Sequence, residues 1–598
     1  MIESIIILTL YLSIILLMSI LMQTVIENML SSIIISWVTW MSLISIFSIC
    51  LSFFNKALSN FIIVAISIII ILFLVFLLRK NKVGLKFQPI NTKDIFVMIV
   101  STVMTFFVFI KRYGFDFNIK FETTDPAVHY IFADYFSKTG LLLPKLNELI
   151  PYAHMSDYPF YSYVNNGILM NLFNIIFTNA QIYIIWNMII YFVTIIMLYK
   201  IVERFVPNLS YKMITLILLL VGFGYNLNDV IFGFSSQMAG MLLVLSIIYI
   251  CSYTYNNLSK FIIIVTFIGL FYSYYYFVPV AWAAIIFFNS YSYKKSGHSI
   301  IKSILNTFNI AITLSLAIFG SLYLFILVDE RGSTALASEG YIYRDLFNSI
   351  LLLIPLIAFY FIKKVNSRKL NIFDFFFVGY ISFSVILFGL GMFGKVSSYY
   401  FYKNHYLLAT LSLIAFSIGL FELSKLNSVI YRSYFLSVIL AFVFYLIIDP
   451  YIKVENLLFN PPSNSIIESV YGFNQNKLNE ERAILSREQQ EFIAFISENK
   501  ESYVGDKNHI SVIGNTLQLL WFYSLTEIWP KDSSQVLSEL YNEEIINYEN
   551  WVNDLEKNPY LIIFGEDNRN WFIENGGNLN DFTVIYSKND AELLKYKY

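Results

Sequence analysis

Charge is scarce in this chain of 598 residues, because Asp, Glu, Lys and Arg together make up only 14% of it. A soluble domain contains roughly 25% charged residues. The shortage is concentrated before residue 450, where long apolar runs follow one another. With 57% hydrophobic residues and a mean hydropathy of +0.64, the composition is that of a membrane protein. The formal net charge of −1 gives no concentrated basic face, so no nucleic-acid partner is expected.

Cysteine is nearly absent, and both copies, Cys50 and Cys251, fall inside apolar runs. A disulfide framework is therefore not expected. The sequence also lacks CxxC pairs and clustered His/Cys metal spacings. No metal ligands are predicted, and a requirement for a divalent metal stays open. The N-terminus has no basic stretch before its apolar run, so we interpret that run as a first membrane helix and not as a signal peptide.

Apolar runs long enough to cross a bilayer recur along the first three-quarters of the chain. A helix needs about 20 apolar residues to cross, and its backbone groups must bond within the helix. The sequence predicts an α-helical polytopic membrane protein with about 14 spans. These are residues 4–22, 33–54, 61–78, 95–110, 182–199, 213–223, 238–255, 261–277, 279–290, 304–328, 347–362, 373–393, 405–421 and 434–448.

Lysine and arginine orient these spans, because they collect in cytoplasmic loops. Basic residues cluster at residues 79–93, 200–212, 294–302, 363–369 and 425–432, which fit one alternating path. That path places outside the cytoplasm the loops 111–159, 226–236, 329–345 and 394–404, and the chain from residue 449 onward. Residues 160–177 are apolar but broken by asparagines, and counting them as a span would invert every later loop. They are predicted to form an interfacial or re-entrant helix.

The chain changes character near residue 450, where charge becomes normal and apolar runs shorten. Residues 1–450 are predicted to form a transmembrane domain with the outer loop 111–167, and residues 451–598 an extracytoplasmic C-terminal α/β domain. The stretch 461–464, PPSN, is typical of a linker. Residues 480–499 fit an amphipathic helix, and residues 510–513, 560–564 and 582–586 fit strands.

The most informative stretch is FETTDPAVHYIFADYFSKTGLLLP, residues 121–144. Asp125 and Pro126 suit a helix start, as cap and first helical residue. The residues that follow fit a membrane-skimming amphipathic helix that Gly140 ends. Asp125 and His129 lie four apart and therefore share one face. A second stretch, PYAHMSDYPFYSYVNNG at residues 151–167, carries His154, Asp157 and Tyr158.

This order of features resembles the type C (GT-C) superfamily of polytopic membrane glycosyltransferases. The shared pattern is a span, an outside Asp (here Asp125-Pro126), a juxtamembrane helix, and a later Tyr-Pro, here Tyr158-Pro159. Oligosaccharyltransferase catalytic subunits, protein mannosyltransferases and arabinosyltransferases belong to it. The motif covers only residues 121–167, while the topology covers the whole chain. The family's acidic loop usually follows the first span, so roughly three helices here would be an N-terminal extension.

The resemblance implies transfer of a sugar from a polyprenyl-phosphate-linked donor to an extracytoplasmic glycan, lipid or protein at a bacterial plasma membrane. Asp125 matches the family's acid, a general base or acceptor-positioning group. His129 and Asp157 are the further catalytic candidates. A leaving phosphate should meet a cation, and GKVSSYYFYKNHY at residues 394–406 supplies candidates. The predicted substrate-binding residues are Lys403, Lys395, His405, His154, Tyr158, Tyr402 and Asp229, with Arg331 and Arg344 as alternative cations.

Each of these residues also has an ordinary structural explanation. Asp125 could be only a helix cap, Lys403 a snorkelling lysine in an aromatic belt, and Asp229 a solvated loop residue. Two other functions stay open: a lipid-linked glycan flippase, which needs a continuous polar path, and a non-catalytic scaffold, in which Asp125, Asp157 and Lys403 would not converge. Few charges lie deep inside the spans, which disfavours an ion-driven carrier.

Overall fold

The computed structural model of the chain describes residues 2–597, with several stretches left out. Those stretches are residues 84–88, 143–157, 207, 254–255, 328–352, 368, 427, 444–469, 482, 505–509 and 529–558. Among the predicted features, His154, Asp157, Arg331, Arg344, the PPSN linker and the domain boundary at 450/451 lie outside the described residues.

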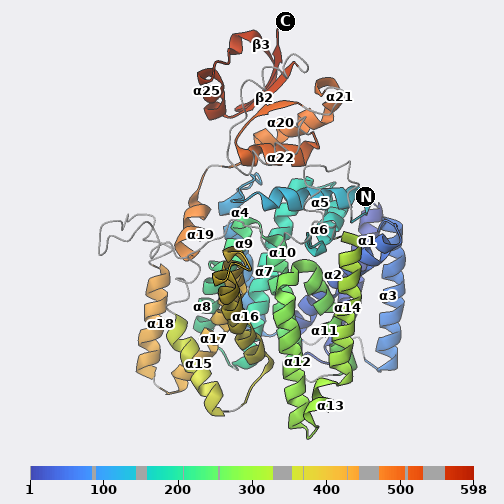
Figure 1. The fold of residues 1–598 in the computed structure, drawn as a ribbon, viewed down its shortest axis with the longest axis vertical. Helices are drawn as coiled ribbons and strands as arrows, with labels where there is room; N and C mark the ends of the chain where they lie inside the picture. The colour runs from blue at the N-terminus through green and yellow to red at the C-terminus, as the bar shows by residue number, and fades with distance from the viewer. Residues whose placement is uncertain are drawn as a thin grey trace.

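A helical bundle fills the lower part of the molecule, and a small sheet domain stands at one end of it (Figure 1). The bundle carries a short 3-10 turn, η2 (Tyr275–Phe277), between two of its helices. Its helices are α1 (Ile2–Met22), α2 (Met29–Phe53), α3 (Asn60–Lys80), α4 (Thr92–Tyr113), α5 (Asp125–Thr139), α6 (Tyr161–Phe173), α7 (Asn179–Phe205), α8 (Tyr211–Gly222), α9 (Tyr225–Phe232), α10 (Ser235–Cys251), α11 (Asn257–Tyr274), α12 (Val278–Lys295), α13 (Ile300–Ile304), α14 (Thr307–Leu327), α15 (Ile354–Ser367), α16 (Ile372–Met392), α17 (Ser398–Leu426) and α18 (Ser428–Val443).

The chain is a polytopic membrane protein, and every predicted span overlaps a described helix. Within the described residues, 10 helical segments are long and apolar enough to cross a bilayer. The sequence predicts about 14 spans, and the difference between this number and the 10 observed segments has a geometric reason. One segment, Asn257–Lys295, joins α11 and α12, while α10, α15 and α18 are shorter, at 17, 14 and 16 residues.

The lipid-facing surface is visible on the outer helices. On α3, for example, Ile69 and Leu72 are each 65% exposed and Phe76 is 57% exposed. Large apolar side chains exposed along a whole helix face are unfavourable in water, but they match the hydrocarbon of a bilayer. The basic residues at the end of α12 lie beside α13, at the end of the bundle opposite the sheet domain (Figure 1). The alternating path from the sequence requires this separation.

Helix α5 lies across the end of the bundle nearest the sheet domain (Figure 1). We expected it to skim the membrane surface, but every residue from Pro126 to Phe136 is buried. The prediction was wrong because α6 packs beneath α5 and helix α22 (Thr516–Thr526) of the C-terminal part packs against it. The amphipathic pattern of one helix carries no information about a distant segment that packs against its polar face.

Helix α6 corresponds to the predicted interfacial or re-entrant segment. It has 13 residues, and at about 1.5 Å per residue it is too short to cross a bilayer. Asn165 and Asn166 are buried in protein, and Asn165 donates to the carbonyl oxygen of Tyr161 at 2.8 Å. A Cβ on Gly167 would lie 2.7 Å from the Ala133 carbonyl oxygen of α5. Glycine therefore permits the close packing of the two helices.

The C-terminal part contains a four-stranded sheet of order β1-β2-β4-β3. Strand β1 pairs parallel to β2, and the other pairs are antiparallel. Its elements are α19 (Val470–Asn479), α20 (Arg487–Glu498), α21 (Lys500–Tyr503), β1 (Ser511–Ile513), α22, β2 (Tyr560–Phe564), α25 (Glu566–Glu574), η8 (Leu579–Asp581), β3 (Phe582–Lys588) and β4 (Ala591–Tyr596). All three predicted strands are present, and α20 lies inside the predicted helix.

Strand β4 was not predicted. It follows β3 through a tight turn in which Asn589 has a φ of 53°, a left-handed conformation that asparagine tolerates better than most residues. The sequence KND at residues 588–590 carries that turn signal. The resulting β3-β4 hairpin completes the edge of the sheet.

Candidate functional site

Asp125 is the first residue of α5, at the end of the bundle that carries the sheet domain. Thr124 occupies the capping position and makes no side-chain cap hydrogen bond, so Asp125 is not the cap that its sequence context predicted. Its side chain is half-buried. A carboxylate in the first turn of a helix is favoured by the partial positive charge of the free backbone N–H groups there.

Lys403 enters the same region from the start of α17. Its ammonium group is buried, with 6% of the residue exposed, and it donates a hydrogen bond to the Tyr399 hydroxyl. It lies over three aromatic rings, at 4.6 Å from the ring centre of Tyr399, 5.3 Å from Phe234 and 5.6 Å from Tyr274. Cation–π contacts of this kind offset part of the cost of removing an ammonium from water.

The charge of Lys403 acts on three of the predicted site residues: Asp125, His129 and Asp229. Asp125 and His129 lie on α5, Asp229 lies on α9 and Lys403 lies on α17, and these three helices are far apart in the sequence. Packing of these helices therefore brings together an acid, an imidazole, a second acid and a lysine that the sequence singled out separately.

His129 follows Asp125 by one turn of α5 and is 4% exposed. Its ring meets the ring of Tyr158 edge-on at 5.1 Å. Burial lowers the pKa of His129 to about 4, which the Asp125 charge opposes and the Lys403 charge assists. The imidazole is therefore neutral at physiological pH. Its Nδ1 atom has no hydrogen-bond partner among the residues that the structure describes.

Asp229 was predicted in an outer loop, but residues 226–236 form α9 and the start of α10. The side chain is fully buried, at 0% exposure, so it is not a solvated loop residue. Its Oδ1 atom accepts a hydrogen bond from the Gln237 side-chain amide at 3.1 Å. Sequence reasoning missed Gln237, because nothing in its neighbourhood distinguishes it from other residues at a helix start.

Three other predicted residues lie away from this cluster. Lys395 is exposed in the turn before α17 and has no ion pair among the described residues. His405 follows Lys403 by two residues, about 200° around the helix, and its Nδ1 atom is 2.9 Å from the Phe401 carbonyl oxygen. Tyr402 packs on Phe401 at 5.3 Å between ring centres. His154 and Asp157 lie outside the described residues.

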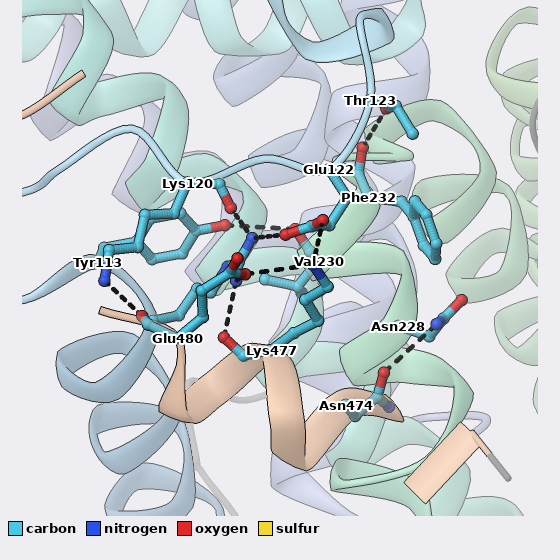
Figure 2. A network of polar contacts seen from close by, with 11 residues as sticks. Tyr113, Lys120, Glu122, Thr123, Asn228, Val230, Phe232, Asn474, Lys477 and Glu480 are labelled. Carbon is cyan, nitrogen blue, oxygen red and sulfur yellow. Dashed lines mark hydrogen bonds and ion pairs between the residues drawn. The ribbon is translucent and has the colours of Figure 1, made fainter. Parts of the chain in front are cut away.

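A buried ion network holds the segment that leads into Asp125 (Figure 2). Arg112, in the last turn of α4, is 1% exposed and donates to Glu122 Oε1 at 2.7 Å. It also donates to the carbonyl oxygens of Lys120 and, at 2.7 Å, of Lys477. The Lys477 ammonium lies 2.7 Å from Glu122 Oε2. Burial alone would raise the pKa of Glu122, but hydrogen bonds and charge from Lys477 and Arg112 lower it overall.

The same network ties α19 to α9 (Figure 2). Asn474 donates to the Phe223 and Gly224 carbonyl oxygens at 2.9 and 2.7 Å, and its own Oδ1 atom accepts from Asn228 at 3.3 Å. Thr123 donates to the Phe232 carbonyl oxygen at 2.7 Å. We call Arg112, Glu122, Lys477 and Asn474 the loop clamp.

The loop clamp ends close to Asp125 and was not predicted. One sequence signal could have found it. Arg112 stands at the predicted outer end of a span, where the positive-inside rule makes a basic residue unexpected.

Aromatic side chains seat the C-terminal part on α5. Trp521 of α22 stacks on Phe121 at 5.9 Å between ring centres and an angle of 14°, and lies 5.5 Å from Tyr130. An ion pair of 2.7 Å between Lys138 and Glu527 adds to this contact. Helix α5 is therefore fixed from both sides, by α6 below and α22 above.

Comparison with known proteins gives a fold likeness. No protein-family description and no curated protein sequence matches the chain. Six solved chains match it in structure. One is the crystal structure of ArnT from Cupriavidus metallidurans bound to undecaprenyl phosphate, with a TM-score of 0.45, 10% identity, and coverage of 84% of this chain and 97% of that chain. This likeness concerns the fold alone.

A metal centre is not apparent in the described part of the chain. No group of three or more His, Cys, Asp or Glu side chains there is arranged to hold a metal ion. On α5, Asp125 and His129 are the residues of these types that lie within the electrostatic reach of Lys403.

Proposed function

We propose that this protein is a membrane glycosyltransferase of a bacterial plasma membrane. It would move a sugar from a polyprenyl-phosphate-linked donor to an extracytoplasmic glycan, lipid or protein. One observation carries the proposal: Asp125 of α5 and Lys403 of α17 interact electrostatically at a buried place beside the membrane bundle. A transferase with a phosphate leaving group needs one group for the acceptor proton and one for the phosphate.

Asp125 would take the proton of the acceptor hydroxyl as the new glycosidic bond forms. A hydroxyl is a weak nucleophile, and a carboxylate within hydrogen-bond reach lowers the barrier to its attack. The half-buried position of Asp125 supports this role, because part of its carboxylate stays accessible to an acceptor. Asp157, which lies outside the described residues, stays a second catalytic candidate.

Lys403 would hold the phosphate of the carrier. An ammonium group has three hydrogen-bond donors, and within the described residues the Lys403 ammonium donates to the Tyr399 hydroxyl. Donors therefore remain for phosphate oxygens, which lysine binds as a point charge. The surrounding rings exclude water and strengthen that interaction.

His129 would not serve as a second cation, since its low pKa keeps it neutral. We assign His129 a positioning role. Its unpartnered Nδ1 atom would form a hydrogen bond with the acceptor, and the contact with the Tyr158 ring would fix the plane of the imidazole.

The test uses membranes that contain the full chain and undecaprenyl-phosphate-linked sugars with a radiolabel in the sugar. Asp125→Asn should lower the transfer rate by about 100-fold or more, because removal of a general base costs that much. Asp116→Asn is the matched control, since Asp116 is exposed in the same outer segment, and it should keep full activity. Undiminished transfer by Asp125→Asn would exclude Asp125 from the mechanism.

A flippase is less well supported. Helix α2 carries a buried row of hydroxyl residues, which could suggest a polar path: Ser31, Ser32, Ser36, Thr39, Ser42, Ser45 and Ser48. However, Ser42 donates to the carbonyl of Val38 in its own helix. A Cβ on Gly269 of α11 would lie 2.2 Å from the Ser42 hydroxyl oxygen. The row therefore serves close packing of helices, as small residues do in membranes.

A further inference from the structure

Three buried polar side-chain atoms belong to residues at the junction of α9 and α10. Asp229 Oδ2, Gln237 Oε1 and Ser236 Oγ have no hydrogen-bond partner among the described residues. Their residues are 0%, 1% and 3% exposed. An unpaired polar atom buried in protein costs free energy, so a ligand that bonds to these atoms would recover that cost.

The geometry fixes which atoms face that ligand. The Gln237 side-chain NH₂ donates to Asp229 Oδ1 at 3.1 Å, so the amide presents its oxygen as a free acceptor. The backbone N–H of Phe234 donates to the Asp229 carbonyl oxygen at 2.9 Å, which holds α9 against the start of α10. The free atoms are therefore a carboxyl oxygen and an amide oxygen, on two side chains that this hydrogen bond joins.

This acceptor pair adjoins the proposed catalytic cluster. The Lys403 ammonium lies over the ring of Phe234, at 5.3 Å, and its charge acts on both Asp229 and Asp125. One buried lysine is thus shared by two acids. A ligand that reaches Lys403 with its phosphate would bring its adjoining group to Asp229 and Gln237.

We propose that Asp229 and Gln237 bind hydroxyl groups of the sugar that the donor carries. This inference rests on the proposed transferase function. The free amide oxygen of Gln237 accepts hydrogen bonds and gives none, so it suits a hydroxyl donor and does not suit a phosphate oxygen. A sugar hydroxyl can both donate and accept, so it can also bond to the free carboxyl oxygen of Asp229. The pair is a sugar-binding subsite beside the phosphate.

The hydrogen-bonding character of the pair narrows the class of sugar. The carboxylate of a uronic acid offers acceptors and no donor, so it would leave the free Gln237 Oε1 atom unpaired. The hydroxyl groups of a neutral hexose or pentose would bond to it. A neutral sugar is therefore the class that this subsite fits.

The experiment measures binding to the full chain in lipid nanodiscs. The probes are undecaprenyl phosphate alone and undecaprenyl phosphate linked to mannose, galactose, arabinose or glucuronic acid. In the natural protein at least one neutral sugar should tighten binding over the bare carrier, and glucuronic acid should not. Asp229→Asn should weaken binding of that neutral probe by about tenfold or more and leave the bare carrier bound no less tightly.

Gln237→Leu should produce the same selective loss. The same result from two different variants would show that misfolding of one of them is not the cause. Ser246→Ala is the control, because Ser246 is buried in α10 and bonded to the carbonyl of Leu242 in its own helix. An equal loss for bare and sugar-linked carriers, no loss for either, or no neutral sugar that improves binding would overturn the subsite. Failure of the transferase function itself would appear differently, as absent transfer by the natural protein despite sugar-dependent binding.

Discussion

Lys403 occupies a buried place without a salt bridge among the described residues. Aromatic rings and one hydroxyl surround its ammonium, and two acids act on it only through their charge. A buried cation in such surroundings is costly unless a further anion reaches it. This makes Lys403 the residue at which a phosphate would bind with most effect.

Replacement of this lysine tests that role. Lys403→Gln should lower sugar transfer by about 100-fold, as loss of one preorganised charge-stabilising donor does, and should weaken binding of bare undecaprenyl phosphate. Lys395→Gln is the matched control, because Lys395 is exposed eight residues earlier, and it should change neither quantity. Equal behaviour of the two variants would show that Lys403 does not meet the phosphate.

His129 makes stability depend on pH. Its pKa falls from the ordinary value of 6.5 to about 4 in the folded chain, so between those values the unfolded state binds more protons. Stability should therefore be fully present above about pH 6.5 and decline as the pH falls toward 4, by about 3 kcal/mol for this residue. Thermal unfolding in detergent at several pH values measures the decline.

His129→Gln should flatten that pH dependence, while the exposed His298→Gln should leave it unchanged. A decline of the same size in the His129 variant would mean that other groups cause it.

At the scale of elements, the loop clamp decides where α5 begins. Residues 114–124 form an irregular segment between α4 and α5. It needs contacts from other segments, because few of its backbone groups bond within it. Arg112 supplies such contacts from α4 and Lys477 from α19, with Glu122 between them. The clamp therefore positions Asp125 without touching a substrate.

Breaking the clamp should cost stability and activity together. Glu122→Gln leaves Arg112 buried with a weaker partner, and should lower the free energy of unfolding by about 1–3 kcal/mol. Asp116→Asn is the control, because the Arg487–Asp116 pair joins the same irregular segment to α20 but is exposed, and exposed pairs contribute about 0–1 kcal/mol. Denaturation of both variants in detergent gives the comparison, and equal losses would show that the clamp does not fix the segment.

At the scale of the whole molecule, the sheet domain and the Asp125–Lys403 cluster share one end of the bundle, and α13 lies at the other (Figure 1). The positive-inside rule predicts that the shared end faces away from the cytoplasm. The transferase proposal requires this orientation.

A labelling experiment in whole cells checks the orientation. Lys395→Cys should react with a maleimide that cannot cross the membrane, and Lys295→Cys should react only after the membrane is opened. Both side chains are exposed, and the natural Cys50 and Cys251 lie within helices of the bundle. The reverse pattern would place Asp125 in the cytoplasm and remove the basis of the proposed function.

The amino-acid sequence by itself determined the membrane helices, because a bilayer imposes a length and an apolarity that each segment must meet alone. It also determined strands β1, β2 and β3, whose apolar runs are local. Asp125, His129 and Lys403 were found as chemical candidates, since acid, imidazole and ammonium groups stand out among apolar neighbours.

Only the tertiary structure decided which of those candidates meet. The burial of α5 depends on Trp521, nearly four hundred residues later in the chain, and the clamp joins Arg112 to Lys477. The bond from Gln237 to Asp229 arises because a turn brings two helices together. Such contacts follow from how packed helices exclude space, and no periodicity within one segment contains that information.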